Sequence, residues 1–156
     1  MRWHYRDPGL LWLFVPAYVV HVGEEWFGGF PAWIGLVVGR PLPASAFFII
    51  NGVALVLLVT GIRAAIGAER YGWIAAALAT IVLVNTVAHL AGAALTGSYS
   101  PGLISAVVLY VPLGLLVMMR ALDQAPRPQL TRGIVAGLLI HGIASVLAFT
   151  FASLGG

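Results

Sequence analysis

The chain contains no cysteine and no lysine, and charged residues make up only 8% of its 156 positions. Without cysteine, disulfides, iron–sulfur clusters and thiolate zinc sites are excluded, so any bound metal must be held by nitrogen and oxygen atoms. A typical soluble domain carries about 25% charged residues. Because 61% of the residues are hydrophobic and the mean hydropathy is +1.01, the sequence predicts an all-α integral membrane bundle with one membrane domain, residues 1–156.

Long apolar stretches divide the chain into five segments, each near the length of about 20 residues that a helix needs to cross a bilayer. These predicted transmembrane segments cover residues 8–27, 44–62, 71–95, 103–119 and 134–154. Pro31, Pro41 and Pro43 interrupt the connection after the first segment, and we expect this connection to lie along the outer surface of the membrane. Neither a soluble domain nor an internal repeat is visible along the sequence.

All eight basic residues are arginines, and their distribution predicts how the chain crosses the membrane. With five spans, Arg40 falls on one side and the other seven fall on the side of the N-terminus. These seven are Arg2, Arg6, Arg63, Arg70, Arg120, Arg127 and Arg132. Because positive loops face the cytoplasm, we expect the N-terminus inside, the C-terminus outside and a bacterial-type inner membrane. The arginines flank apolar spans and form no basic stripe, so no nucleic-acid partner is expected.

The first segment carries three ionisable side chains, His21, Glu24 and Glu25, close to one helical turn. A charged residue at the centre of a membrane helix costs about 2.5–3.5 kcal/mol on the insertion scale, so such residues usually mark functional sites. Positions i, i+3 and i+4 share a helix face, so the three side chains point toward the same neighbour. Trp26 and Phe27 follow at once, and an interfacial helix end is the alternative interpretation.

Further polar residues lie in the other segments. Asn85 and His89 are four residues apart on one face of the third segment, and His141 lies in the fifth. At a rise of 1.5 Å per residue, we expect Asn85 and His89 to lie in the outer half of the bilayer, at the depth of the polar residues of the first segment. His141 is expected toward the inner side. An interhelical hydrogen bond, worth about 0.6 kcal/mol, is the alternative for Asn85 and the favoured interpretation for Asn51. A packing role is the alternative for His141.

Imidazole and carboxylate groups that converge from several helices suit Zn²⁺, Fe²⁺ or Mn²⁺. The predicted ligands of such a divalent metal are His21, Glu24, His89 and His141. Glu25 is the predicted catalytic base, and Asn85 would position the substrate. Because the two glutamates lie about 100° apart around the helix, we expect one of them to bind the metal directly. Glu24 is favoured, and Glu25 is then a base or a supporting residue.

Three functions fit these residues. The first is a membrane-embedded metal-dependent enzyme that acts on a membrane lipid or another lipophilic small molecule. The second is a metal-free acid–base enzyme, such as a lipid double-bond isomerase, that uses the same histidines and glutamates. The third is a non-enzymatic transporter or metal-binding membrane protein, against which the lack of an inverted repeat counts. A structural role and a homo-oligomeric state both stay open.

Three motifs follow one another along the chain, His21-Val-Gly-Glu24-Glu25, Asn85-Thr-Val-Ala-His89 and Tyr99-Ser-Pro101-Gly102. In this order and spacing they resemble the motifs of the HXXEE-domain family, a group of small multi-span membrane proteins, and the resemblance covers most of the chain. It implies an integral membrane protein with a catalytic or metal site, but no particular reaction. From the residues alone, the third motif is first of all a turn between two spans.

Overall fold

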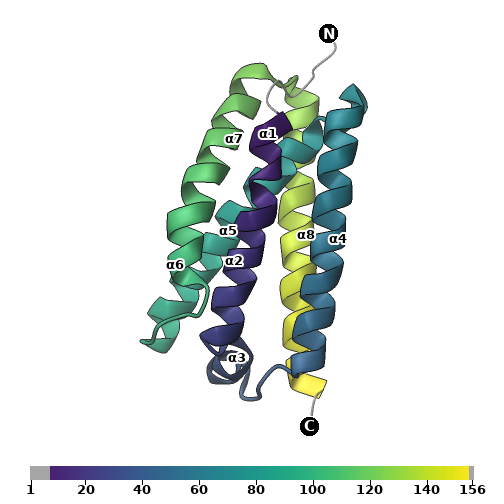
Figure 1. Ribbon diagram of the computed structural model, residues 1–156. Helices are drawn as coiled ribbons and strands as arrows, with labels where there is room; N and C mark the ends of the chain where they lie inside the picture. The colour runs from purple at the N-terminus through teal and green to yellow at the C-terminus, as the bar shows by residue number, and fades with distance from the viewer. Residues whose placement is uncertain (1–7, 155–156) are drawn as a thin grey trace.

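The computed structural model describes residues 8–154, and every regular element in this part of the chain is a helix (Figure 1). Arg2 and Arg6, which enter the predicted topology, lie outside the described residues. The long elements are α1 (Pro8–Trp12) with α2 (Phe14–Phe27), α4 (Ala44–Gly67), α5 (Trp73–Thr96), α7 (Val111–Gln124) and α8 (Arg127–Leu154). They run up and down the bundle, with a short helix, η1 (Glu69–Tyr71), between α4 and α5. The predicted all-α fold is confirmed.

Two prolines explain why two of the passes are irregular. Pro16 lacks the N–H that would bond to the carbonyl of Trp12, and the helix is interrupted at Leu13 between α1 and α2. The fourth pass begins with α6 (Leu103–Ser105), widens into the π-helical turn η2 (Ala106–Tyr110) and continues as α7. Pro112 follows directly, and the wide turn relieves the clash of its ring with the carbonyl of Val108.

Four stretches are long and apolar enough to cross a membrane, namely Ala44–Gly67, Glu69–Thr96, Leu103–Gln124 and Arg127–Leu154. They correspond to the second to fifth predicted segments. The last begins at Arg127 rather than at residue 134, because Pro128 lies in the first turn of α8, where a helix needs no N–H partner. The first predicted segment coincides with α1 and α2 together. Since it is divided at Leu13, it is not among the four, and the prediction of five spans stays a prediction.

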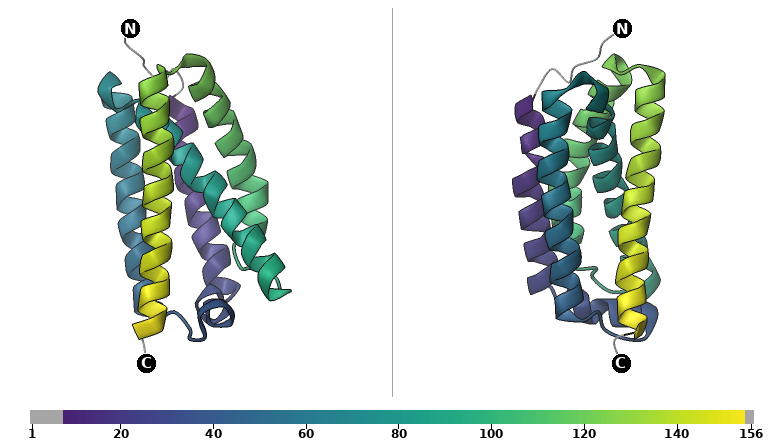
Figure 2. Two further views of the ribbon diagram at one scale, coloured as in Figure 1. Left: turned by 180° about the vertical axis from the view of Figure 1, so that it is seen from behind. Right: turned by 90° about the vertical axis from the view of Figure 1, so that its right-hand side faces the viewer.

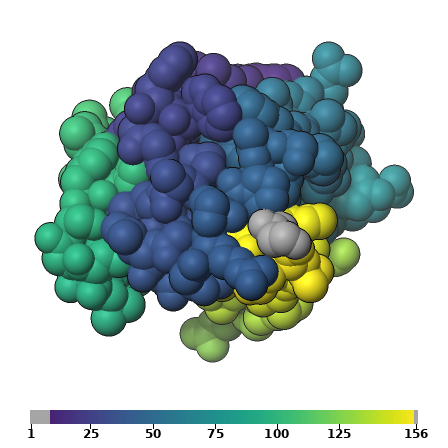
Figure 3. Space-filling model, turned by 90° about the horizontal axis from the view of Figure 1, so that it is seen from below, coloured from purple at the N-terminus to yellow at the C-terminus, as the bar shows by residue number. Residues whose placement is uncertain are grey.

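The connection between α2 and α4 contains a helix that the sequence did not predict, α3 (Phe30–Val38). Pro31 lies in its first turn, where proline is tolerated. Seen from below, the dark blue residues of this region cover the end of the bundle between its green and yellow parts (Figure 3). The expected surface piece is therefore a helical cap over one end of the bundle.

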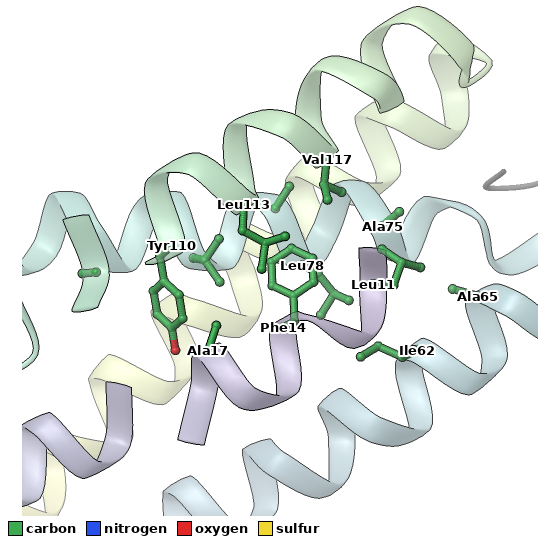
Figure 4. Packing of buried hydrophobic residues seen from close by; sticks show 13 residues of the cluster. Leu11, Phe14, Ala17, Ile62, Ala65, Ala75, Leu78, Tyr110, Leu113 and Val117 are labelled. Carbon is green, nitrogen blue, oxygen red and sulfur yellow. The ribbon is translucent and has the colours of Figure 1, made fainter. Parts of the chain in front are cut away.

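The bundle is held together by an apolar core and by a close helix pair. The core lies between α1, α2, α4, α5 and α7, and its fully buried residues include Leu11, Phe14 and Val117 (Figure 4). Helix α5 crosses α8, as Figure 2 shows, and glycines permit their close approach. A Cβ atom at Gly137 would lie 2.7 Å from the carbonyl oxygen of Ala77. Small residues of this kind let membrane helices pack backbone to backbone.

Candidate functional site

One face of α2 changes character along its length. Its buried residues are Phe14 and Ala17 in the first half and His21 and Glu25 in the second, at the spacing of a single helix face. The second half faces His89 of α5, which is also buried. Two histidines and one glutamate from two helices are thereby enclosed near the end of the bundle that α3 covers.

The three side chains form a compact triad. The Oε1 atom of Glu25 lies 3.5 Å from Nε2 of His21 and 3.4 Å from Nε2 of His89. One ligand atom from each residue lies within 4.8 Å of the other two, and the three residues are 2–7% exposed. Two atoms that each lie about 2.0–2.1 Å from a tetrahedral metal are about 3.4 Å apart. The separations to Glu25 therefore fit a shared metal ion.

Two serine hydroxyls hold the other ring nitrogens of the histidines. The Oγ atom of Ser105 lies 2.9 Å from Nδ1 of His21, and the Oγ atom of Ser100 lies 2.9 Å from Nδ1 of His89. Metal-binding histidines typically have such a partner, which fixes the ring orientation and the tautomer. Each histidine thus directs Nε2 toward Glu25.

The hydrogen bonds of Ser105 indicate where the proton of His21 lies. The Ser105 hydroxyl donates to the carbonyl oxygen of Gly102, at 3.2 Å, so it accepts from Nδ1–H of His21. In the neutral imidazole the lone pair of Nε2 then faces the carboxylate of Glu25. This buried Nε2 atom has no hydrogen-bond partner among the described residues. Two acceptors that face each other in a buried site need a cation between them, either a metal ion or a proton.

Gly102 closes the site from the loop between α5 and α6. Its φ of +99° is in the region that favours glycine. A Cβ atom there would lie 2.7 Å from Cε1 of His89 and 2.9 Å from both Cγ of Glu25 and Cε1 of His21. The backbone of the loop therefore packs directly against all three triad residues, and no other amino acid fits at this position without a shift.

Glu24 points away from the triad and fastens the same loop. Its carboxylate accepts hydrogen bonds from the hydroxyl of Tyr99 and from the backbone N–H groups of Ile104, at 3.0 Å, and Ser105, at 2.6 Å. The pKa of Tyr99 is raised to about 12, mainly by partial burial and secondly by the hydrogen bond to the negative Glu24. The structure groups Glu25 rather than the favoured Glu24 with the histidines. The predicted metal role of Glu24 is not tested by this geometry alone.

The two remaining predicted site residues lie near the triad but outside it. His141 is partly buried on α8 and interacts electrostatically with His89 and Glu25. Asn85 lies one turn before His89, and its Oδ1 atom is buried without a hydrogen-bond partner among residues 8–154. Their roles as ligand and as substrate-positioning residue stay predictions. Asn51 forms the expected interhelical bond, because the hydroxyl of Tyr18 donates to its Oδ1 at 2.7 Å.

Sequence reasoning missed the loop residues that complete the site. It interpreted Tyr99-Ser-Pro-Gly102 as a turn, whereas Ser100 and Gly102 contact the triad. Ser105 and Tyr110 are polar residues of an otherwise apolar segment, and the Tyr110 ring lies 4.5 Å from that of His21, centroid to centroid. The signal that could have identified the loop was the third motif, since all three motifs meet at one place.

Comparison with known proteins agrees with the motifs. Residues 12–117 match the family described as "Protein of unknown function with HXXEE motif". No curated protein and no solved structure matches the chain. The matched region contains α2, α5, α6 and the loop before α6, which are the elements that supply the triad and its serine partners. The chain belongs to the HXXEE family.

Proposed function

We propose that this protein is an integral membrane protein with five spans in one domain, in which the pair α1–α2 forms the first span. The N-terminus then faces the cytoplasm and the C-terminus the outside of a bacterial-type inner membrane. The support comes from the four long apolar helices and from the arginine distribution, with seven on one side and Arg40 on the other. In this orientation the triad lies in the outer half of the membrane.

Within this frame, His21, Glu25 and His89 bind a divalent metal ion. The main support is the geometry of a buried site. The Nε2 atoms of His21 and His89 lie 3.5 Å and 3.4 Å from the same carboxylate oxygen of Glu25. The donor set of two imidazoles and a carboxylate suits Zn²⁺, Fe²⁺ or Mn²⁺. His141 is the nearest further histidine among the described residues that could supply a fourth ligand.

The function that this site supports best is a membrane-embedded, metal-dependent enzyme that acts on a lipophilic substrate. A bound metal would supply Lewis acidity or activate water. Around it, the serines fix the histidine orientations, and Glu24 holds both the loop that carries Ser100 and the start of α6, which carries Ser105. Asn85, with its unpaired Oδ1 atom, is placed to receive a hydrogen bond from a substrate. In this arrangement Glu25 is a metal ligand, because its carboxylate is the only one in the triad among the described residues.

The second function is acid–base chemistry without a metal, as in a double-bond isomerase of a lipid. It is favoured by the same convergence, because a proton shared between Glu25 and either histidine also satisfies the facing acceptors. The two functions differ in what occupies the centre of the triad. Metal content therefore separates them.

The test is the metal content of the purified protein without a histidine tag, measured by mass spectrometry. We expect about one metal per chain in the wild type and its loss in His21→Ala and His89→Ala. Thr60→Ala is the matched control, because this hydroxyl bonds to carbonyls of its own helix, and it should keep the metal. Absence of metal after loading with Zn²⁺, Fe²⁺ and Mn²⁺ would contradict the metal site and favour the acid–base function.

A further inference from the structure

The loop between α5 and α6, residues 97–102, closes the triad at the end of the bundle that α3 also covers, and we call it the lid (Figure 1). Ser100 in the lid is 0% exposed, and Pro101 packs against the end of α2. A Cβ atom at Gly28 would lie 2.9 Å from that of Pro101. Together with Gly102, whose backbone lies against all three triad residues, these contacts separate the triad from the outer surface.

The other directions of approach to the triad are apolar. Toward the inner side, the buried face of α2 continues with Ala17 and Phe14 into the apolar core. Toward the membrane, Val20, Ile104 and Val108 are 54–61% exposed and would face lipid. Moving an ion through either region is costly, because neither offers it polar partners. The outer end is therefore the least costly route by which an ion or water reaches the triad.

The two parts of the outer cover are held in different ways. Helix α3 is held by apolar packing, since Ile34 is 3% exposed and lies in a buried cluster with residues of α4 and α8. The lid is fixed by one carboxylate. Glu24 accepts hydrogen bonds from the Tyr99 hydroxyl inside the lid and from the N–H groups of Ile104 and Ser105 directly after it. A change at Glu24 therefore loosens the lid and leaves α3 in place.

Glycines at both ends of the lid permit it to move. Gly97 has a φ of +62° and Gly102 a φ of +99°, and glycine changes its backbone dihedrals at little steric cost. Hinges are typically a few residues at the end of an element that absorb such changes. Gly97 is exposed, and nothing lies within 4 Å of its Cβ position. It is thus the free hinge, whereas Gly102 is the part that covers the triad.

We propose that the lid is the aqueous entrance to the triad and that Glu24 is a positioning residue that holds the lid closed. When the carboxylate releases its three donors, the lid turns about its first glycine, and the Nε2 atoms of His21 and His89 become accessible from the outer side. The two adjacent glutamates then have separate tasks, because Glu25 faces the histidines and Glu24 controls access. The inference rests on the proposed function only in naming a divalent metal ion as the solute that enters.

The first experiment measures the rates of Zn²⁺ binding and release by stopped flow, with the full chain in nanodiscs. If the ion exchanges only while the lid is open, both rates are proportional to the open population. A hydrogen bond to a charged group is worth at least about a factor of ten, so Glu24→Gln should accelerate association and dissociation by about tenfold or more. The two changes cancel in the Kd, which should stay within about threefold of the wild type.

Two further variants locate the effect. Tyr99→Phe removes one of the three donors and keeps the carboxylate, so both rates should rise by a smaller factor than in Glu24→Gln. Tyr71→Phe removes a tyrosine hydroxyl from η1, which lies between α4 and α5 at the other end of the bundle, and should leave both rates unchanged. If Glu24 were itself a metal ligand, Glu24→Gln would accelerate dissociation alone. That result, or an unchanged association rate, would overturn the proposal.

The second experiment needs no metal. Diethyl pyrocarbonate modifies accessible imidazoles, and mass spectrometry of peptides reports the rate at each histidine of the metal-free chain. We expect His21 and His89 to react faster in Glu24→Gln than in the wild type, with Tyr99→Phe between them and Tyr71→Phe unchanged. His141 on α8 is the internal reference and should react equally in all variants. Equal rates at His21 and His89 in wild type and Glu24→Gln would overturn the lid.

The two experiments separate this inference from the proposed function. If no variant binds metal but modification of His21 and His89 depends on Glu24 as expected, the metal function fails and the lid stands. If the wild type binds metal through the triad but neither the exchange rates nor the modification depend on Glu24, the lid fails and the metal site stands. Unchanged deuterium exchange along α8 in Glu24→Gln serves as the control for an intact fold.

Discussion

The two halves of α2 present the same buried face with opposite chemistry. In the first half, Phe14 and Ala17 pack into the apolar core with Leu11 and Val117. In the second half, His21 and Glu25 occupy the next positions of that face and meet His89. Helical periodicity thus decides which positions are buried, and residue type decides whether burial produces packing or a site. The first half stabilises a fold in which the second half holds groups that are costly to bury.

The largest expected effect is the loss of unfolding free energy in Phe14→Ala, which changes the first half of α2 and leaves the second half intact. The side chain is 1% exposed, and deletion of a buried phenylalanine typically costs about 3–5 kcal/mol of unfolding free energy. Metal affinity at a temperature where the variant is folded should be unchanged, because Phe14 lies two turns from His21. Denaturation in detergent and metal titration measure the two quantities. Loss of both together would show that the halves of α2 are not independent.

The next largest effect is expected from His89→Ala. Removal of a triad histidine should lower metal affinity by more than about 100-fold, since even residues that only orient a ligand change affinity by 10–100-fold. Titration with Zn²⁺ against a competing chelator provides the measurement. An affinity within tenfold of the wild type would exclude His89 as a ligand. The far-ultraviolet dichroism spectrum serves as the control for helix content.

A smaller effect is expected from Ser105→Ala, which keeps the triad and removes the partner of His21 Nδ1. Metal affinity should fall by about 10–100-fold, through loss of the fixed ring orientation. Ser105→Thr retains the hydroxyl and should restore most of the affinity. Ser145→Ala, whose hydroxyl bonds to a carbonyl of its own helix, is the control for removal of a serine and should behave as the wild type.

The smallest effect is expected at Tyr99, on the rim of the site. Its pKa is raised from 10 to about 12, so its stabilising contribution is complete below pH 10 and is lost as the pH rises through 12. The ultraviolet difference between wild type and Tyr99→Phe should therefore show phenolate formation near pH 12. In Glu24→Gln the titration should move back toward 10. Titration of Tyr99 near 10 in the wild type would exclude the bond to Glu24.

Much of this fold followed from simple patterns. The first predicted segment, residues 8–27, covers α1 and α2 and ends with α2 at Phe27, because apolar length and flanking charge are local properties of the sequence. The interruption at Leu13 and helix α3 were not predicted. The interruption depends on how Pro16 meets the carbonyl of Trp12. The position of α3 depends on the packing of Trp33 against Gly92. Such contacts between distant residues are absent from any local pattern.

The candidate site was predicted in part for the same reason. Three polar motifs indicated that His21 and His89 meet, but they did not decide between Glu24 and Glu25. The decision depends on the loop after α5, whose Tyr99 and backbone N–H groups engage Glu24 and leave Glu25 to the histidines. The position of this loop is set by α3, since Nε1 of Trp33 donates to Ser98 at 3.2 Å.

The distribution of the triad along the chain has a consequence for biosynthesis. His21 and Glu25 emerge from the ribosome early, and their partner His89 follows 68 residues after His21 (89 minus 21). At about 5–20 residues per second, this delay is about 3–14 s. During that interval the first helix carries a carboxylate and an imidazole without His89. If α1–α2 forms the proposed first span, its stable insertion therefore waits for α5. Chains arrested before residue 89 should then be extracted from the membrane more easily than full-length chains.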